Sequence, residues 1–328
     1  MRYHFVTTDV FTDRLFGGNP LAVLPDARGL GDAAMQQIAR EFNLSETVFV
    51  LPPDNPANSR KLRIFTPACE VPFAGHPTLG TALVLARLGE ISLAGEVTEI
   101  VLEEGAGPVP VMLRAADGVV NFAQLTAPQA PSIGPGPAPA VVASALSLTP
   151  SDVITTDGLP KVVSCGLPFL LVRLASRDAL GRAKLNRTVW ARQLAGTPGE
   201  FVYLFTEDVP ADASHDIQAR MFCPGAGFEE DPATGSAAAA LGGWLGHVAP
   251  ESDATTRAVI GQALEIGRPS RLEVEVERRS GQVTAVRVGG TAVLVSEGTI
   301  EVPETPDAAT SQATVTQSMA ADLEGVEA

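Results

Sequence analysis

Basic residues are scarce in this sequence, and the scarcity limits the partners that the protein can bind. The 328 residues include 23 Lys and Arg against 38 Asp and Glu, so the formal net charge is −15. Nucleic-acid binding depends on Lys and Arg side chains that neutralise phosphates, and no basic stripe appears along the chain. We therefore expect no nucleic-acid partner.

Cysteines and long apolar runs are also scarce. Cys69, Cys165 and Cys223 are too few and too scattered for a disulfide framework or a CxxC metal site, so we expect small buried hydrophobic residues and no bound metal. No run approaches the roughly 18 apolar residues that span a bilayer, and the N-terminus has no apolar signal core. These absences predict a cytoplasmic protein that does not contact membranes.

The residues that are present predict two similar halves. The chain is 45% hydrophobic and 19% charged, and it is long enough for two domains with well-filled cores. Short words recur in the same order, with offsets between 148 and 157 residues. The matching words are GNPLAV (18–23) and GLPFLL (166–171), TVFVL (47–51) and FVYLF (201–205), RIFTP (63–67) and RMFCP (220–224), and HPTLGTALVLARLG (76–89) and DPATGSAAAALGGWLG (231–246). We infer two copies of one unit.

Hydrophobic periodicity predicts the same kind of α/β lobe in each copy. Four segments are typical of strands: YHFVTTDVF, LAVLP, ETVFVLP and KLRIFTP. Residues 32–42 have the pattern of an amphipathic helix. The segments that follow His76 and Asp231 predict helices with almost no polar face, which must be enclosed on nearly all sides. A strongly curved sheet wrapped around a central helix satisfies this requirement in each half.

The two apolar helices also indicate where a ligand binds. Asp231 directly precedes a proline, a pattern typical of a helix N-cap, and capping alone is one interpretation of this residue. In a pair of related lobes, however, the His76-Pro77 and Asp231-Pro232 helix starts can face each other across the junction. Each helix start supplies unpaired N–H groups and a partial positive charge. We therefore expect a site between the lobes for a small molecule with a carboxylate.

Several motifs together resemble one known family. FGGNPLAV, IAREFNLSETVFVLPP, RIFTPACEVPFAGHPTLGTA and DPATGSA are similar to motifs of the PhzF-like phenazine-biosynthesis family, which has a diaminopimelate epimerase-like fold. The resemblance covers roughly residues 1 to 300. It implies two lobes, each a mixed barrel-like sheet around a helix, in a homodimer. It also implies cofactor-independent isomerisation of a cyclic amino acid, trans-2,3-dihydro-3-hydroxyanthranilate.

The resemblance also assigns residues to the site. It implies that Glu46 is the general acid and base, that His76 and Asp231 are the other catalytic residues, and that five neighbours bind the substrate. These five are Asn19, Ser45, Gly75, Gly235 and Ser236. From the residues alone, Glu46 could instead be a solvated residue at a strand start, and His76 a helix cap.

Other functions stay open at this stage. The related epimerases place one cysteine at each helix start, and this chain does not, which disfavours epimerisation by two thiols. A carbon-acid epimerase, a tailoring isomerase of another pathway and a catalytically silent dimeric binding protein remain alternatives. Fold and family do not by themselves determine which of these holds.

The predicted domain boundaries follow from the repeat and from composition. We expect a first lobe over residues 1–126, completed by residues 290–302, and a second lobe over 141–289. The Pro/Gly-rich segment 127–140 is predicted to be a semi-rigid linker. Residues 303–328 contain five acidic residues and no Lys, Arg or aromatic residue, so we expect a disordered acidic tail.

Overall fold

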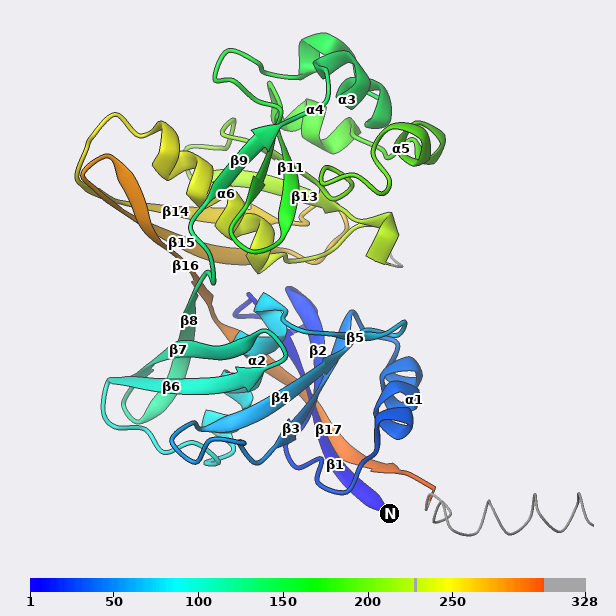
Figure 1. Ribbon diagram of the computed structural model, residues 1–328, viewed down its shortest axis with the longest axis vertical. Coiled ribbons are helices and arrows are strands. Elements are labelled where there is room, and N and C mark those ends of the chain that lie inside the picture. The colour runs from blue at the N-terminus through cyan, green and yellow to red at the C-terminus, as the bar shows by residue number, and fades with distance from the viewer. Residues whose placement is uncertain (227–228, 304–328) are drawn as a thin grey trace, which may run out of the picture.

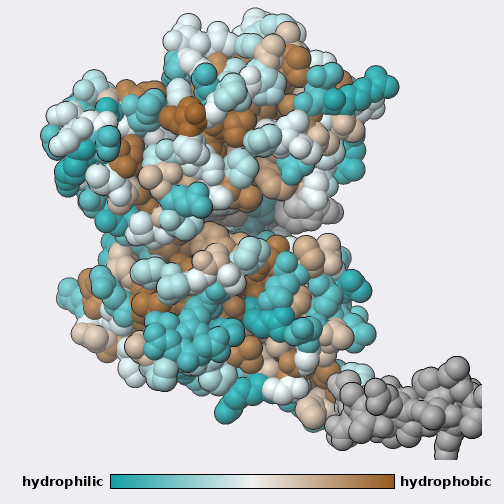
Figure 2. All heavy atoms as spheres, viewed as in Figure 1, coloured by the Kyte–Doolittle hydropathy of each residue, from teal (hydrophilic) through white to brown (hydrophobic). Residues whose placement is uncertain are grey.

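The computed structural model describes residues 1–226 and 229–303, which form two stacked lobes (Figure 1). The acidic tail predicted from residue 303 onward therefore lies, apart from Pro303, outside the described residues. Among the residues described, no helix is both long and apolar enough to cross a membrane. Figure 2 shows that the surface narrows to a waist where the two lobes meet.

The lower lobe in Figure 1 is a mixed sheet curved around one helix. Its strands, in the order in which they pair, are β17 (Ala292–Glu301), β1 (Arg2–Val10), β2 (Asn19–Leu24), β3 (Glu46–Leu51), β4 (Arg60–Phe65), β6 (Val97–Glu104), β7 (Gly107–Ala116) and β8 (Val119–Thr126). The short β5 (Glu70–Val71) forms a hairpin with β4. The helices are α1 (Asp32–Phe42), outside the sheet, and α2 (Gly75–Arg87), inside it.

The upper lobe repeats this arrangement. Its strands, in pairing order, are β9 (Ser132–Pro135), β10 (Lys161–Ser164), β11 (Pro168–Arg173), β12 (Val202–Thr206), β13 (Ile217–Phe222), β14 (Ala254–Gln262), β15 (Ser270–Arg279) and β16 (Gln282–Gly290). The central helix is α6 (Gly235–Val248), and α3 (Pro139–Ala145), α4 (Arg177–Arg182) and α5 (Arg187–Gln193) lie outside, with 3₁₀ turns at Pro150–Asp152 and Pro224–Ala226.

The two lobes follow the same order of parallel and antiparallel pairings, which confirms the predicted pseudo-symmetric architecture. In each lobe the third and fourth strands of the pairing order are parallel, namely β2 with β3 and β11 with β12. Arg63 and Arg220 occupy the same place in β4 and β13, and each guanidinium lies over a phenylalanine two residues further on. The likeness thus extends to single side chains.

The central helices are enclosed as predicted. Every residue of α2 from Gly75 to Leu85 is buried, and α6 is buried along most of its length. Small residues allow the close approach: a Cβ on Gly242 of α6 would lie 2.5 Å from Val274 of β15. Burial of these apolar helix faces against the sheets is the main favourable contribution to the stability of each lobe.

The lobes are joined by pairing as well as by chain crossings. Residues 287–290 of β16 pair with residues 123–126 of β8, so one continuous sheet passes between the lobes. The 127–140 segment, predicted to be a linker, contains β9 and the start of α3, and only residues 127–131 cross as irregular chain. Residues 132–135 pair with β10 although the prolines and glycines of this segment are typical of turns. The pairing is possible because Pro131 precedes the strand and Pro135 ends it, so no proline lies in its interior.

Candidate active site

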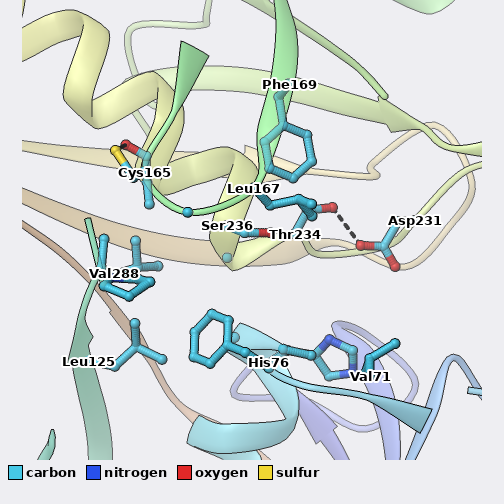
Figure 3. A pocket seen from close by; sticks show the side chains of 18 of the residues that line it. Val71, His76, Leu125, Cys165, Leu167, Phe169, Asp231, Thr234, Ser236 and Val288 are labelled. Carbon is cyan, nitrogen blue, oxygen red and sulfur yellow. Dashed lines mark hydrogen bonds between the residues drawn. The ribbon is translucent and has the colours of Figure 1, made fainter. Parts of the chain in front are cut away.

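A cavity of about 630 Å³ lies between the lobes and opens beside the N-termini of α2 and α6. Figure 3 shows His76 and Asp231 at one side of it and Leu125 and Val288 at the other. Both halves of the chain line this cavity, as the two facing helix starts predicted. Clefts between domains are the usual place for small-molecule sites.

Strand alternation places Asn19 and Glu46 beneath the cavity. Asn19 begins β2 and lies on the same face as Leu21, and Glu46 begins β3 and lies on the same face as Val48. That face packs against α2, because Leu21 and Val48 belong to the core around this helix. Leu21 is paired with Glu46 across the two parallel strands, which keeps Glu46 close to the start of β2.

His76 contacts both of these residues from the first turn of α2. Its Nε2 atom is 3.2 Å from Oε2 of Glu46, and neither atom has a hydrogen bond of good geometry within residues 1–226 and 229–303. Its Nδ1 atom is 3.3 Å from Nδ2 of Asn19. An amide nitrogen offers no lone pair to accept a proton, so this neighbour disfavours a proton on Nδ1 and favours the neutral tautomer with its proton on Nε2.

Asp231 lies before helix α6 and is not its N-cap, which differs from the prediction. The sequence predicted Asp231 as N-cap and Pro232 as the first helical residue, whereas α6 begins at Gly235 and Thr234 is its N-cap. The Thr234 hydroxyl donates a hydrogen bond to Oδ2 of Asp231. Asn19 Nδ2 donates to Oδ1 of Asp231 at 2.9 Å and to the Ala233 carbonyl at 2.9 Å. Asp231 therefore belongs to a loop that Asn19 attaches to the other lobe.

Burial changes the protonation of these three side chains. Burial, together with the negative charge of Asp231, raises the pKa of Glu46 to about 8. Burial lowers the pKa of His76 to about 3, so His76 is neutral at neutral pH. Burial also raises the pKa of Asp231 to about 6, against the hydrogen bonds from Thr234 and Asn19. The site thus holds carboxyl groups that can exchange protons near neutral pH.

The N-termini of α2 and α6 provide unpaired backbone donors beside these groups. A Cβ on Gly75 would lie 3.7 Å from the Gly235 Cα, so the two helix starts are in contact. Neither N-cap residue accepts a side-chain hydrogen bond from its first turn. The first N–H groups of both helices, near Gly75, Gly235 and Ser236 on the cavity wall, remain available for an anion.

Not every predicted site residue lines the cavity. Glu46, His76, Asp231, Gly75, Gly235 and Ser236 do so. Asn19 is fully buried behind them and acts through its hydrogen bonds. Ser45 is half-buried next to Glu46 and is not among the described residues that line the cavity, so direct substrate binding by Ser45 is not supported by its position.

Two side chains that sequence analysis did not single out, Thr234 and Gln262, support the Asp231 loop from behind. Gln262, at the end of β14, donates to the Asp231 carbonyl at 2.8 Å and to the Thr234 hydroxyl at 3.1 Å. Its Oε1 atom accepts from the Thr234 N–H at 3.2 Å and from the Tyr203 hydroxyl at 3.3 Å. The hydroxyl three residues after Asp231 was a detectable signal for Thr234, but Gln262 is brought here only by the pairing of β13 with β14.

The cysteines have mixed positions. Cys165 and Cys223 are buried, as predicted, whereas Cys69 is exposed at the turn that follows β4, which contradicts the prediction. Cys165 and Cys223 also line the cavity. Burial raises the pKa of Cys165 to about 12 and that of Cys223 further. Both side chains are therefore protonated thiols at neutral pH, and not the nucleophilic thiolates.

Comparison with known proteins gives relatives along nearly the whole chain. Residues 8–298 match a family model, PhzC-PhzF, described as phenazine biosynthesis-like protein. The chain is 41% identical over 300 residues to an uncharacterized isomerase of Mesorhizobium japonicum, across 90% of this chain and 97% of the relative. It is 35% identical over 298 residues to the trans-2,3-dihydro-3-hydroxyanthranilate isomerase of Pseudomonas aeruginosa, across 90% of this chain and 98% of the relative.

A solved structure agrees with these relatives. The PhzF-family phenazine biosynthesis protein of Bacillus anthracis superposes with a TM-score of 0.83 at 25% identity, across 92% of this chain and 100% of that chain. The match spans both lobes, so the pairing of two related α/β units is common to the two proteins.

Proposed function

Because this chain belongs to the phenazine biosynthesis-like PhzC-PhzF family and is an isomerase, we propose that it moves a proton between carbons of a small cyclic amino acid without a cofactor. The resemblance of its motifs to this family is thereby confirmed. The proposed substrate carries a carboxylate, as trans-2,3-dihydro-3-hydroxyanthranilate does. Its support is the name of the relative from Pseudomonas aeruginosa and the pair of helix N-termini in the cavity.

The observation that carries the proposal is the position of one buried carboxyl group beside a neutral imidazole. Glu46, once ionised, accepts a proton from a substrate carbon, and the electron pair left behind spreads through the ring towards the carboxylate. Protonated Glu46 then returns the proton to a different carbon, so no net charge or atom is lost. A pKa of about 8 suits one group for both steps.

The neighbouring groups hold the substrate during these steps. The N–H groups at the starts of α2 and α6 face the position of a substrate carboxylate and stabilise negative charge that develops there. The His76 imidazole lies beside the reacting carboxyl group, with Nε2 at 3.2 Å from Oε2 of Glu46. Asp231, partly protonated near neutral pH, is able to contact an amino or hydroxyl group of the ring.

Transfer by one carboxyl group predicts partial retention of the original hydrogen. In deuterated water, the product from trans-2,3-dihydro-3-hydroxyanthranilate should keep part of the hydrogen at the new position, because the buried Glu46 exchanges slowly with solvent. Mass spectrometry and proton NMR of the product measure this fraction. Product formed with complete deuteration would contradict intramolecular transfer, and no product from this compound would overturn the proposed substrate.

The pH dependence of activity should follow the ionisation of Glu46. The base must be deprotonated, so kcat/KM should rise with pH through an apparent pKa near 8 and become level above it. Asp231→Asn should move this rise to lower pH, because the charge of Asp231 raises the pKa of Glu46. Profiles at constant ionic strength measure both effects, and a rise that Asp231→Asn leaves in place would count against Glu46 as the titrating group.

Two other expectations stay predictions. A homodimer and a cytoplasmic location were inferred from the family resemblance and from composition. Sedimentation of the purified protein tests the first, and cell fractionation tests the second.

A further inference from the structure

Most of the cavity wall lies beyond the reach of Glu46, His76 and Asp231, and the side chains of this part are mainly apolar. Leu125 of β8 and Val288 of β16 are directly opposite each other in the ladder that joins the lobes, and both line the cavity. Figure 3 shows them across the cavity from Asp231, with Phe169 above. The rings of Phe169 and Phe201, 6.2 Å apart between centroids, continue this wall in the upper lobe.

The described wall of the cavity has acidic residues but no basic ones. Among the described residues that line the cavity, none is Lys or Arg. A second anionic group on the ligand would therefore lie in an apolar region without a cation, which is strongly unfavourable. The helix N-termini offer a place for one carboxylate only, beside Gly75 and Gly235.

The size of the cavity adds a third constraint. A volume of about 630 Å³ lies within the range of sites that enclose drug-sized ligands. A single six-membered ring with its carboxylate, amino and hydroxyl groups is smaller than a drug-sized ligand and leaves part of this volume free. The remaining volume, beside Leu125, Val288 and Leu167, is lined mainly by apolar side chains, with Gln129 as a polar exception and no charged group to hold an ionic extension.

We propose that the natural substrate is a monocarboxylate with an apolar body, an aryl or branched alkyl group that extends from the reacting carbons towards Leu125, Val288 and Phe169. This inference rests on the proposed function for the place of the carboxylate, and it adds the chemistry of the rest of the molecule. Leu125 and Val288 then determine specificity without taking part in proton transfer.

A homologous series of ligands tests this assignment by binding alone. We would titrate the purified full chain with benzoate, 4-ethylbenzoate, 4-butylbenzoate and the dicarboxylate terephthalate, in a calorimeter. Affinity should rise about fourfold for each added methylene until the cavity is filled, because each buried CH₂ contributes a transfer free energy of that size. Terephthalate should bind more weakly than benzoate.

A matched pair of variants locates the effect. Val288→Thr keeps the shape of the side chain and adds a hydroxyl to the cavity wall, so the preference for 4-butylbenzoate over benzoate should fall at least threefold. Val286→Thr makes the same change two residues earlier on β16, where Val286 is buried against α6, and should leave the preference unchanged. The series on the unaltered chain stands even where a variant does not fold.

The outcomes separate this inference from the proposed function. Equal affinities across the alkyl series, tighter binding of terephthalate, or binding of no member would overturn the apolar-body assignment. Equal loss of preference in the two variants would also overturn it. A clear chain-length preference in a protein that transfers no proton would uphold the assignment and overturn only the proposed reaction.

Discussion

Replacing Glu46 by Gln should lower turnover of the ring substrate by a factor of about 10² to 10⁴, the contribution of a positioned acid–base group. Gln keeps the size of the side chain and can still contact His76, but it cannot accept a proton from carbon. Binding of a carboxylate ligand should therefore survive. Steady-state kinetics and calorimetry on the same preparation measure the two quantities separately.

Glu104 offers a matched control for this substitution. It is also a buried carboxyl group, and burial raises its pKa to about 8 against a hydrogen bond with Thr78. It does not line the cavity between the lobes. Glu104→Gln should change turnover only a few-fold; if both variants lose activity equally, loss of a buried carboxyl group and not loss of the base explains the result.

Replacing Arg220 by Met should destabilise the protein by about 3 to 5 kcal/mol, because it leaves the buried carboxylate of Glu230 without its partner. Both side chains are only 9% exposed, and Arg220 contacts Glu230 with two nitrogens, at 2.9 and 2.7 Å. The guanidinium also donates to the carbonyls of Leu180 and Ala183. Urea unfolding followed by tryptophan fluorescence measures this change, since Trp190 and Trp244 both lie in the upper lobe.

The repeat supplies the control at the equivalent position. Arg63 pairs with Glu70 in the lower lobe, but these side chains are 21% and 41% exposed. Water screens this pair, so Arg63→Met should cost about 1 kcal/mol or less. A similar loss for the two variants would show that burial of the ion pair does not determine the effect, because both variants lose the same guanidinium and keep an apolar stem. Arg220→Met should also reduce turnover, because Glu230 directly precedes Asp231.

The features that could be predicted from the sequence are those that depend on local periodicity. The strand containing Val48 alternates between the core around α2 and the core under α1, and this alternation is visible in the residue pattern. The apolar composition of α2 and α6 predicted their enclosure. Glu46 and His76 were found because each stands in a motif with a fixed place in the fold.

The start of α6 could not be predicted from the same pattern. Asp231-Pro232 has the local chemistry of a helix start, but Asp231 makes its hydrogen bonds with Asn19 of the other lobe and with Thr234. These contacts hold residues 231–234 out of the helix. The equivalent helix starts are thus Gly75 and Gly235, a larger offset than the sequence echoes suggested. Contacts between residues more than 200 positions apart leave no periodic signal.

The apolar wall of the cavity also could not be predicted from the sequence. Leu125 and Val288 are each typical of a strand interior, and the pattern around them is that of ordinary core residues. Only the antiparallel pairing of β8 with β16 brings them together on one surface. The same holds for Gln262, whose neighbours on β14 give no indication of a partner in the Asp231 loop.

The return of β17 to the lower lobe has a consequence for synthesis on the ribosome. β1 emerges about 290 residues before its partner β17, and Met1 and Val302 exchange backbone hydrogen bonds at 2.8 Å. At about 5 to 20 residues per second, β1 waits roughly 15 to 60 seconds with an open edge. β8 waits in the same way for β16. The lower lobe is therefore completed only after the whole upper lobe, whose strands β9 to β16 follow one another along the chain, has been synthesised.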